Sequence, residues 1–242
     1  MVTRNVDHST AIDAGIPLVG REDELRFLAR RVRHRQTILV HGPLGSGKSR
    51  LVREALRFST QPATVVQRPP ALHGLLVSLA RALTNSPKPD RETSAGLKKK
   101  TLDALQRAPR CLVIEDLTMA DPRMYRFLQQ VFYVPNVCLV VTATSRDALG
   151  YVRKLLWDPR AELRLEPLNK PDSHRLFDQA VEFFGLSGLD ILPFREKVLD
   201  AAHGNPGQIL AMCRLAARPE YQAGRYIKFL PLRIDVLSSY LP

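Results

Sequence analysis

The octapeptide Gly42-Pro43-Leu44-Gly45-Ser46-Gly47-Lys48-Ser49 follows the apolar run TILV and precedes the amphipathic stretch SRLVREAL. It fits the pattern G-x-x-x-x-G-K-[ST], whose glycines let the backbone curl until successive N–H groups point at one anion. In this pattern Lys48 reaches the β- and γ-phosphates of a nucleotide, and the Ser49 hydroxyl ligates magnesium. The motif and its position predict a phosphate-binding loop and disfavour a Gly-rich turn without a ligand. The residues predicted to bind the nucleotide here are Gly42, Gly45, Ser46, Gly47, Lys48 and Ser49.

Such a loop needs an acidic side chain at the end of a neighbouring strand, which holds magnesium and polarises the attacking water. The run Cys111-Leu112-Val113-Ile114-Glu115-Asp116 supplies two carboxylates after four apolar residues. Neighbouring strand residues point to opposite faces, so the two carboxylates are expected to have different roles. We assign Glu115 to the magnesium shell and Asp116 to the water, and the reverse order stays open. Two exposed acids at a strand end with no catalytic role are the alternative.

Up to Leu168, short apolar runs alternate with amphipathic stretches, which is typical of a parallel sheet covered by helices on both faces. The expected strands are TILVHG from Thr37, ATVVQ from Ala63, CLVIED from Cys111, VCLVVTAT from Val137 and AELRLEPL from Ala161. Apolar residues at helical spacing mark residues 51–56 and 124–132 as helices between them. The sequence therefore predicts an α/β fold with five parallel strands.

After Leu168 three helical patterns follow without a strand between them, over residues 176–184, 191–201 and 209–216. Gly185 and Gly204 stand where the first two helices should end. We expect a loose N-terminal tail over residues 1–15, an α/β nucleotide-binding domain over residues 16–168, and a helical lid domain with the C-terminal segment over residues 169–242. Residues 86–95, SPKPDRETSA, are expected to form an exposed loop.

Composition excludes several classes of protein. Of 242 residues, 45% are hydrophobic and 25% are charged, which argues against disorder and against a membrane-embedded chain. No apolar run approaches the length of about 20 residues that a membrane crossing needs, and the first residues lack the apolar core of a secretion signal, so a cytoplasmic protein is expected. Cys111, Cys138 and Cys213 stand far apart among apolar neighbours, which favours buried thiols over disulfides or metal ligands.

Further segments surround the two motifs. They are Leu18-Val19-Gly20-Arg21-Glu22, Ala120-Asp121-Pro122, Val140-Val141-Thr142-Ala143-Thr144-Ser145-Arg146-Asp147, Leu165-Glu166-Pro167-Leu168 and Gly204-Asn205-Pro206. Together with the motifs they resemble the ATPase module of STAND-class signalling NTPases, a branch of the AAA+ P-loop ATPases that is also similar to origin-recognition ATPases. The resemblance implies that adenine lies between Val19-Gly20-Arg21 and the Pro206 region and that Arg146 senses the γ-phosphate.

The chain departs from this family pattern at several positions. Typical AAA+ members place Asp before Glu, whereas here Glu115 precedes Asp116; an aspartate base is about one methylene shorter and positions water less well, so slow turnover is expected. Gly207 stands where many AAA+ lids carry an arginine, which puts a second sensor in doubt. Arg160 occupies the kind of place where an arginine finger reaches a neighbouring subunit, with Arg153 as a competitor and a surface ion pair as the alternative.

Charge points to a polyanionic partner. The chain has 36 Lys+Arg against 24 Asp+Glu, a net charge of +12, which favours DNA, although a basic surface kept for solubility is the alternative. Lys98, Lys99 and Lys100 are expected at the beginning of a helix, where each cation costs about 0.3 to 1 kcal/mol. DNA phosphates would offset this cost, while a solvated lysine run is the other interpretation. Residues 225–233 mix cations with aromatics, as surfaces that grip a strand do, or dock their apolar side chains on the lid.

The leading hypothesis is therefore a Mg²⁺-dependent ATPase that binds ATP, hydrolyses it slowly, associates with DNA and forms oligomers with ATP bound. An alternative of another class is a STAND-like signalling adaptor that acts through protein partners. A small-molecule phosphotransferase is disfavoured by the lid and sensor segments.

Overall fold

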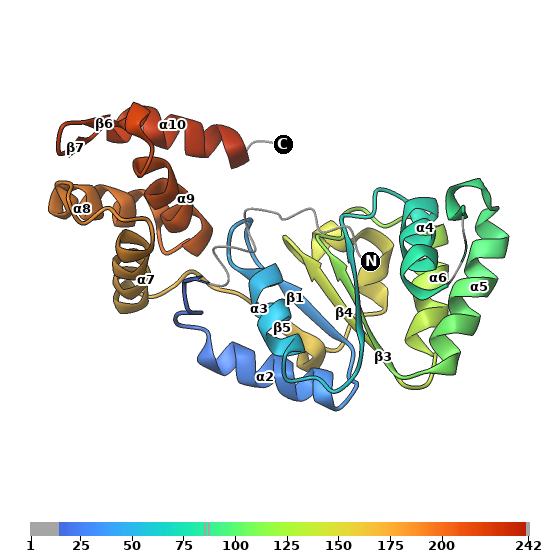
Figure 1. Ribbon diagram of the computed structural model, residues 1–242. Helices are drawn as coiled ribbons and strands as arrows, with labels where there is room; N and C mark the ends of the chain where they lie inside the picture. Colours follow the sequence, from blue (N-terminus) through green and yellow to red (C-terminus); the bar gives the residue numbers. More distant parts are fainter. Residues whose placement is uncertain (1–14, 85, 87, 241–242) are drawn as a thin grey trace. The chain divides into compact units, whose positions relative to one another are not determined.

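The computed structural model describes residues 15–84, 86 and 88–240 (Figure 1). Apart from Gly15, the predicted tail over residues 1–15 lies outside the described residues. The described chain divides into a sheet unit, residues 23–43 and 48–165, and a helical unit, residues 15–22, 44–47 and 166–240. The tip of the phosphate-binding loop, Leu44–Gly47, thus groups with the helical unit. None of the described helices combines the length and apolar composition that a membrane crossing requires.

The sheet unit contains a five-stranded parallel sheet, as the sequence predicts. Its strands are β1 (Ile38–His41), β2 (Ala63–Gln67), β3 (Arg110–Glu115), β4 (Val137–Ala143) and β5 (Glu162–Arg164). They lie in the order β2-β3-β4-β1-β5. Strands β1 and β4 are buried along their whole length, because helices cover both faces there and most of the residues are β-branched or aliphatic. β5 is shorter than the predicted run from Ala161 to Leu168, and β2 at the opposite edge buries only alternate side chains.

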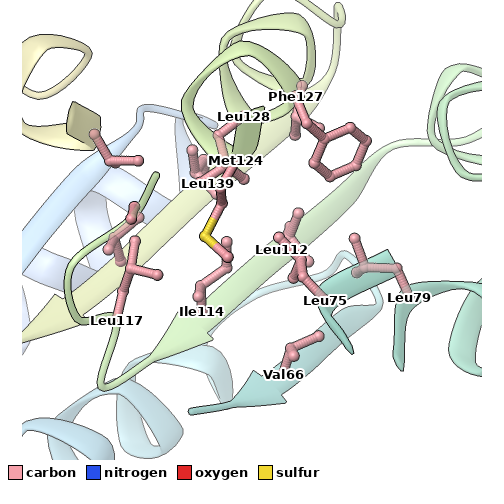
Figure 2. Packing of buried hydrophobic residues seen from close by; sticks show 14 of the residues in the cluster. Val66, Leu75, Leu79, Leu112, Ile114, Leu117, Met124, Phe127, Leu128 and Leu139 are labelled. Carbon is pink, nitrogen blue, oxygen red and sulfur yellow. The ribbon is translucent and has the colours of Figure 1, made fainter. Parts of the chain in front are cut away.

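The α-helices that the structure describes in this part of the chain belong with the sheet. They are α2 (Glu22–Arg33), α3 (Lys48–Leu56), α4 (Leu72–Leu83), α5 (Ser94–Arg107) and α6 (Pro122–Phe132). Figure 1 shows α4, α5 and α6 on one side of the sheet and α2 and α3 on the other. Figure 2 shows Met124 and Leu128 of α6 above Ile114 and Leu139, in the same buried cluster as Leu75 of α4. This two-sided cover holds the carboxyl ends of β1, β3 and β4 in place, where the site residues lie.

The described residues of segment 86–95 are mostly exposed, as its composition predicts, but parts of the segment are helical. A short 3₁₀ helix covers Pro89–Arg91, with Pro89 buried, and α5 already begins at Ser94. The Thr93 hydroxyl caps α5 by accepting a hydrogen bond from the Gly96 N–H. The polar Thr93 therefore starts helix α5, a role that threonine commonly has at an N-cap.

From residue 166 to residue 240, the helical unit is a succession of helices with a short strand pair before the last of them. Its elements are α7 (Lys170–Phe183), α8 (Ile191–Ala202), α9 (Pro206–Ala216), β6 (Gln222–Ala223), β7 (Tyr226–Ile227) and α10 (Phe229–Tyr240). Gly185 and Gly204 have φ values of +67° and +76° just after α7 and α8, as expected of helix-ending glycines. Phe229 and Leu232 of α10 are buried in the core of this unit. The docking interpretation of residues 225–233 is thus the one that the structure supports.

Candidate functional site: a phosphate-binding loop with paired carboxylates

The octapeptide forms the turn between β1 and α3, the place that the motif predicts. Gly45 and Gly47 have φ values of +81° and +93°, which L side chains rarely adopt, so the curl of the loop requires glycine at both positions. The Ser46 side chain is buried, and its Oγ has no hydrogen-bond partner. A buried hydroxyl without a partner is costly unless a ligand supplies the bond. The loop therefore fits a bound phosphate.

Lys48 is the first residue of α3 and is only 4% exposed. Its Nζ donates hydrogen bonds to the carbonyl oxygens of Gly42 at 2.9 Å and Pro43 at 3.0 Å. Burial lowers the pKa of the Lys48 ammonium; Asp116 acts in the opposite direction, and Arg68 adds to the lowering. An ammonium that burial disfavours gains more from a nearby phosphate than a solvated one does.

Glu115 ends β3 and is 4% exposed. Burial raises the pKa of the Glu115 carboxyl above its ordinary value, with a contribution in the same direction from Asp116. Arg53 and hydrogen bonds from the side chains of Ser49 and Gln67 act in the opposite direction. Ser49 and Glu115 therefore lie near each other, one on α3 and the other at the end of β3, and they are the two residues that the sequence assigns to magnesium.

These donors fit a magnesium ion. Mg²⁺ takes hard oxygen ligands, and it is typically held by one or two protein groups together with substrate phosphates and water. The Ser49 hydroxyl and the Glu115 carboxylate are such groups. Within the described residues no group of three or more His, Cys, Asp or Glu side chains is placed to hold a metal ion. The assignment of Ser49 and Glu115 to magnesium, and of Asp116 to the water, stays a prediction.

Asp116 follows β3 with a φ of +49°. Its N–H donates to the Thr142 Oγ1 at 2.9 Å, and its Oδ2 accepts from the Arg68 Nε at 3.1 Å. The left-handed backbone turns Asp116 away from the regular strand path, so Glu115 and Asp116 lie in different environments. Glu115 is buried near Ser49. The side chain of Asp116 is 21% exposed and pairs with the exposed Arg68.

The residues that the resemblance assigns to adenine all lie in the helical unit. Val19 is in its buried core, and Pro206 is the first residue of α9, with its Cγ 4.0 Å from the position that a Cβ on Gly47 would take. Arg21 is 5% exposed and donates a hydrogen bond to the carbonyl of Glu166. A role of Val19, Gly20, Arg21 and Pro206 in adenine binding stays a prediction.

Gly20 is expected to tolerate no side chain. Its φ is +64°, and a Cβ there would lie 2.5 Å from the Asp172 Oδ2. Gly20→Ala should lower the free energy of unfolding by about 2 to 5 kcal/mol, the sum of the left-handed backbone and the overpacking costs. Gly185→Ala is the matched control, because Gly185 has a φ of +67° with nothing within 4 Å, and should cost only about 1 to 2 kcal/mol. Urea unfolding of both variants measures the difference; equal losses would contradict the contact with Asp172.

Arg146 and Arg160 lie between β4 and β5. The Arg146 guanidinium pairs with Glu162 at 3.1 Å and donates to the carbonyl of Trp157 at 3.3 Å. Glu162 also contacts the buried His41 of β1 at 2.6 Å. Arg160 is exposed on a 3₁₀ helix, Pro159–Ala161. The sensor role of Arg146 and the finger role of Arg160 stay predictions.

The lysine run occupies a different part of its helix from the one expected. Because α5 begins at Ser94, Lys98, Lys99 and Lys100 lie in its second turn, outside the first turn where the helix dipole opposes cations. The prediction that these lysines lie at the very start of the helix, which suggested a phosphate partner, was therefore wrong. Lys99 and Lys100 are exposed, and Lys100 pairs with Glu92 at 2.8 Å. Their role in nucleic-acid binding stays a prediction that now depends on charge and exposure.

Sequence reasoning missed Arg68 and Thr142 as neighbours of Asp116. Thr142 carried a signal, since it is the one polar side chain in the apolar run VCLVVTA of β4. Arg68 follows β2, but nothing in the sequence says that β2 lies beside β3.

Comparison with known proteins then decides the family. A model of the AAA ATPase domain matches residues 17–140, about half of the chain, and the match includes the phosphate-binding loop and both carboxylates. The chain belongs to the AAA ATPase domain family. A search of curated proteins found no match.

Solved structures share the fold of this AAA ATPase. The Aeropyrum pernix ORC1 protein in complex with DNA is 18% identical with a TM-score of 0.63, and the match covers 92% of this chain and 66% of that one. The Walker-type ATPase of Pyrococcus abyssi is 16% identical with a TM-score of 0.61, covering 92% and 73% of the two chains. The Thermotoga maritima RuvB Holliday junction branch migration motor is 14% identical with a TM-score of 0.58, covering 91% and 70%. The chain thus spans about two thirds of the length of the ORC1 protein.

Proposed function

We propose that this AAA ATPase is a magnesium-dependent ATP-binding switch that hydrolyses ATP slowly, associates with DNA and forms oligomers in its ATP-bound state. The observation that carries the proposal is the phosphate-binding loop, with Lys48 buried against its carbonyls and the buried Ser46 hydroxyl without a partner. ATP and Mg²⁺ are the ligands that this arrangement fits. In this proposal residues 16–168 bind the phosphates, and residues 169–242 form a lid.

The ion pair between Asp116 and Arg68 supports slow turnover. A carboxylate that acts as a general base must accept a proton from water, and the Arg68 guanidinium at 3.1 Å already occupies one oxygen of Asp116. In our proposal Arg146 leaves its ion pair with Glu162 when it senses the γ-phosphate, and it pairs with Glu162 again when that phosphate is lost. The two nucleotide states would then favour two packings of the chain, as in a population shift. A protein or DNA partner that displaces Arg68 would stimulate hydrolysis.

Association with DNA is supported by charge and by the neighbours. The net charge is +12, one structure with the same fold is an ORC1 protein in complex with DNA, and another is a Holliday junction branch migration motor. Oligomers would bring Arg160 of one subunit to the nucleotide of the next.

A second candidate function is a STAND-like signalling or adaptor ATPase that acts through protein partners. One observation favours it: Leu230, Ile234 and Leu237 of α10 are 72%, 63% and 47% exposed and follow one another at helical spacing. An exposed apolar stripe of this kind is typical of protein contact surfaces.

A salt titration of duplex DNA binding, with and without ATP, tests the proposal against this alternative. The logarithm of the DNA affinity should fall linearly with the logarithm of salt concentration, with a slope of about −0.9 per neutralised phosphate. Changing Lys98, Lys99 and Lys100 together to Glu should flatten the slope. The matched control changes Lys170, Lys197 and Lys228 of the helical unit to Glu. It changes the net charge by the same amount and should keep most of the slope.

Particle mass measured in the same samples reports assembly. The proposal expects a rise in mass with ATP and DNA together. DNA binding that is absent at low salt with ATP present would reject DNA association and leave the adaptor function in its place.

A further inference from the structure

The amino end of α9 makes two hydrogen bonds to the tip of the phosphate-binding loop. The Asn205 Nδ2 donates to the Leu44 carbonyl at 2.8 Å, and the Gly207 N–H donates to the Gly45 carbonyl at 2.9 Å. Pro206 between them has no N–H, so Gly207 supplies the first backbone donor that α9 has to offer. All of these residues belong to the helical unit.

The Asn205 side chain has two separate roles at this point. Its Oδ1 accepts a hydrogen bond from the Gln208 N–H at 3.2 Å and so caps α9, while its Nδ2 makes the bond to Leu44. Serine performs the first role about as well as asparagine does, because its hydroxyl also accepts at an N-cap. The shorter serine side chain has no amide to perform the second.

The two bonds fix the orientation of two peptide groups. A peptide unit is planar and trans, so its C=O and its N–H point in opposite directions. Holding the carbonyls of Leu44 and Gly45 toward α9 therefore holds the N–H groups of Gly45 and Ser46 away from α9. These two N–H groups belong to the run whose convergence on one anion the motif requires. Ser46 is only 4% exposed, and its hydroxyl, which is buried without a partner, lies in the same turn.

We propose that Asn205 is a positioning residue for phosphate binding: its amide, with the Gly207 N–H, orients the loop so that the Gly45 and Ser46 N–H groups are ready for a phosphate before the nucleotide arrives. This inference rests on the proposed ATP-binding function and assigns to Asn205 a contact with the loop, not with the nucleotide.

Asn205→Ser tests the role, since it keeps the cap and removes the donor to Leu44. Loss of one neutral hydrogen bond is expected to weaken ATP binding about three- to tenfold by calorimetry. The affinity for inorganic tripolyphosphate, measured by competition, should fall by the same factor, because the loop contacts only phosphate groups. The matched control is Asn169→Ser at the N-cap of α7, where Oδ1 accepts from the Asp172 N–H at 2.8 Å, and it should leave ATP affinity unchanged.

The outcomes are distinct. An Asn205→Ser variant that binds ATP with wild-type affinity would overturn the inference. A variant that loses affinity for ATP but not for tripolyphosphate would also overturn it, because Asn205 would then act through the nucleoside. If Asn205→Ser lowers the melting temperature of the nucleotide-free protein, Asn205→Asp replaces it, since a carboxylate caps a helix well and cannot donate; it should weaken both ligands further. Failure of the wild-type protein itself to bind ATP would reject the proposed function instead.

Discussion

Lys48→Ala is expected to weaken ATP binding by about 100-fold or more. Alanine removes the ammonium and with it the charge-assisted hydrogen bonds to two phosphates, each worth about 1.5 to 3 kcal/mol. A loss of about 1.4 kcal/mol lowers the affinity tenfold. Calorimetry with Mg-ATP measures the effect.

The same change should not destabilise the nucleotide-free protein through charge. Folding lowers the pKa of Lys48 by burial, so the charged lysine is less favourable in the folded than in the unfolded state at neutral pH, and alanine removes that penalty. Lys154→Ala, at an exposed lysine of the sheet unit that lies over the Tyr151 ring, is the control for loss of a positive charge. Unchanged ATP affinity in Lys48→Ala would contradict the assignment of the phosphate-binding loop.

Asp116→Asn should bind ATP within about threefold of the wild-type affinity but hydrolyse it about 100-fold more slowly or worse, the usual contribution of a general base. Asparagine is tolerated in the left-handed region, so the φ of +49° at this position should survive the change. Steady-state phosphate release at saturating ATP measures turnover.

Glu115→Gln separates the two carboxylates. If Glu115 holds magnesium together with Ser49, this variant should need more Mg²⁺ for half-maximal ATP binding, whereas Asp116→Asn should not. Loss of turnover in Glu115→Gln with an unchanged Mg²⁺ requirement would show that the two roles are the reverse of those proposed here.

The fold could be predicted from the sequence because its signals are local. The β-branched runs of β3 and β4 and the apolar spacing of α6 each lie within a few consecutive residues, and each forms the predicted element. The segment 86–95 shows the limit of the same approach. Proline and small polar residues occur both in turns and at helix starts, and the cap from the Thr93 side chain begins α5 at Ser94, inside this segment.

The candidate site was predictable only in part. The motif itself names Lys48 and Ser49, and a carboxylate after an apolar run points to Glu115. The lysine run was misplaced within its helix because the helix start depends on one cap, and the ends of helices are the least predictable part of a sequence pattern.

The sequence by itself determined the phosphate-binding loop, the parallel sheet around it and the run of helices after Leu168, since residue type, period and spacing are properties of short stretches. Only the tertiary structure decided which side chains surround the loop and the carboxylates. Thr142 lies 26 positions from Asp116, Arg68 lies 48 positions from it, and Asn205 lies 161 positions from Leu44. The order of strands and the packing of α9 bring these residues together, and such long-range contacts follow from how whole elements pack and not from any local pattern of residues.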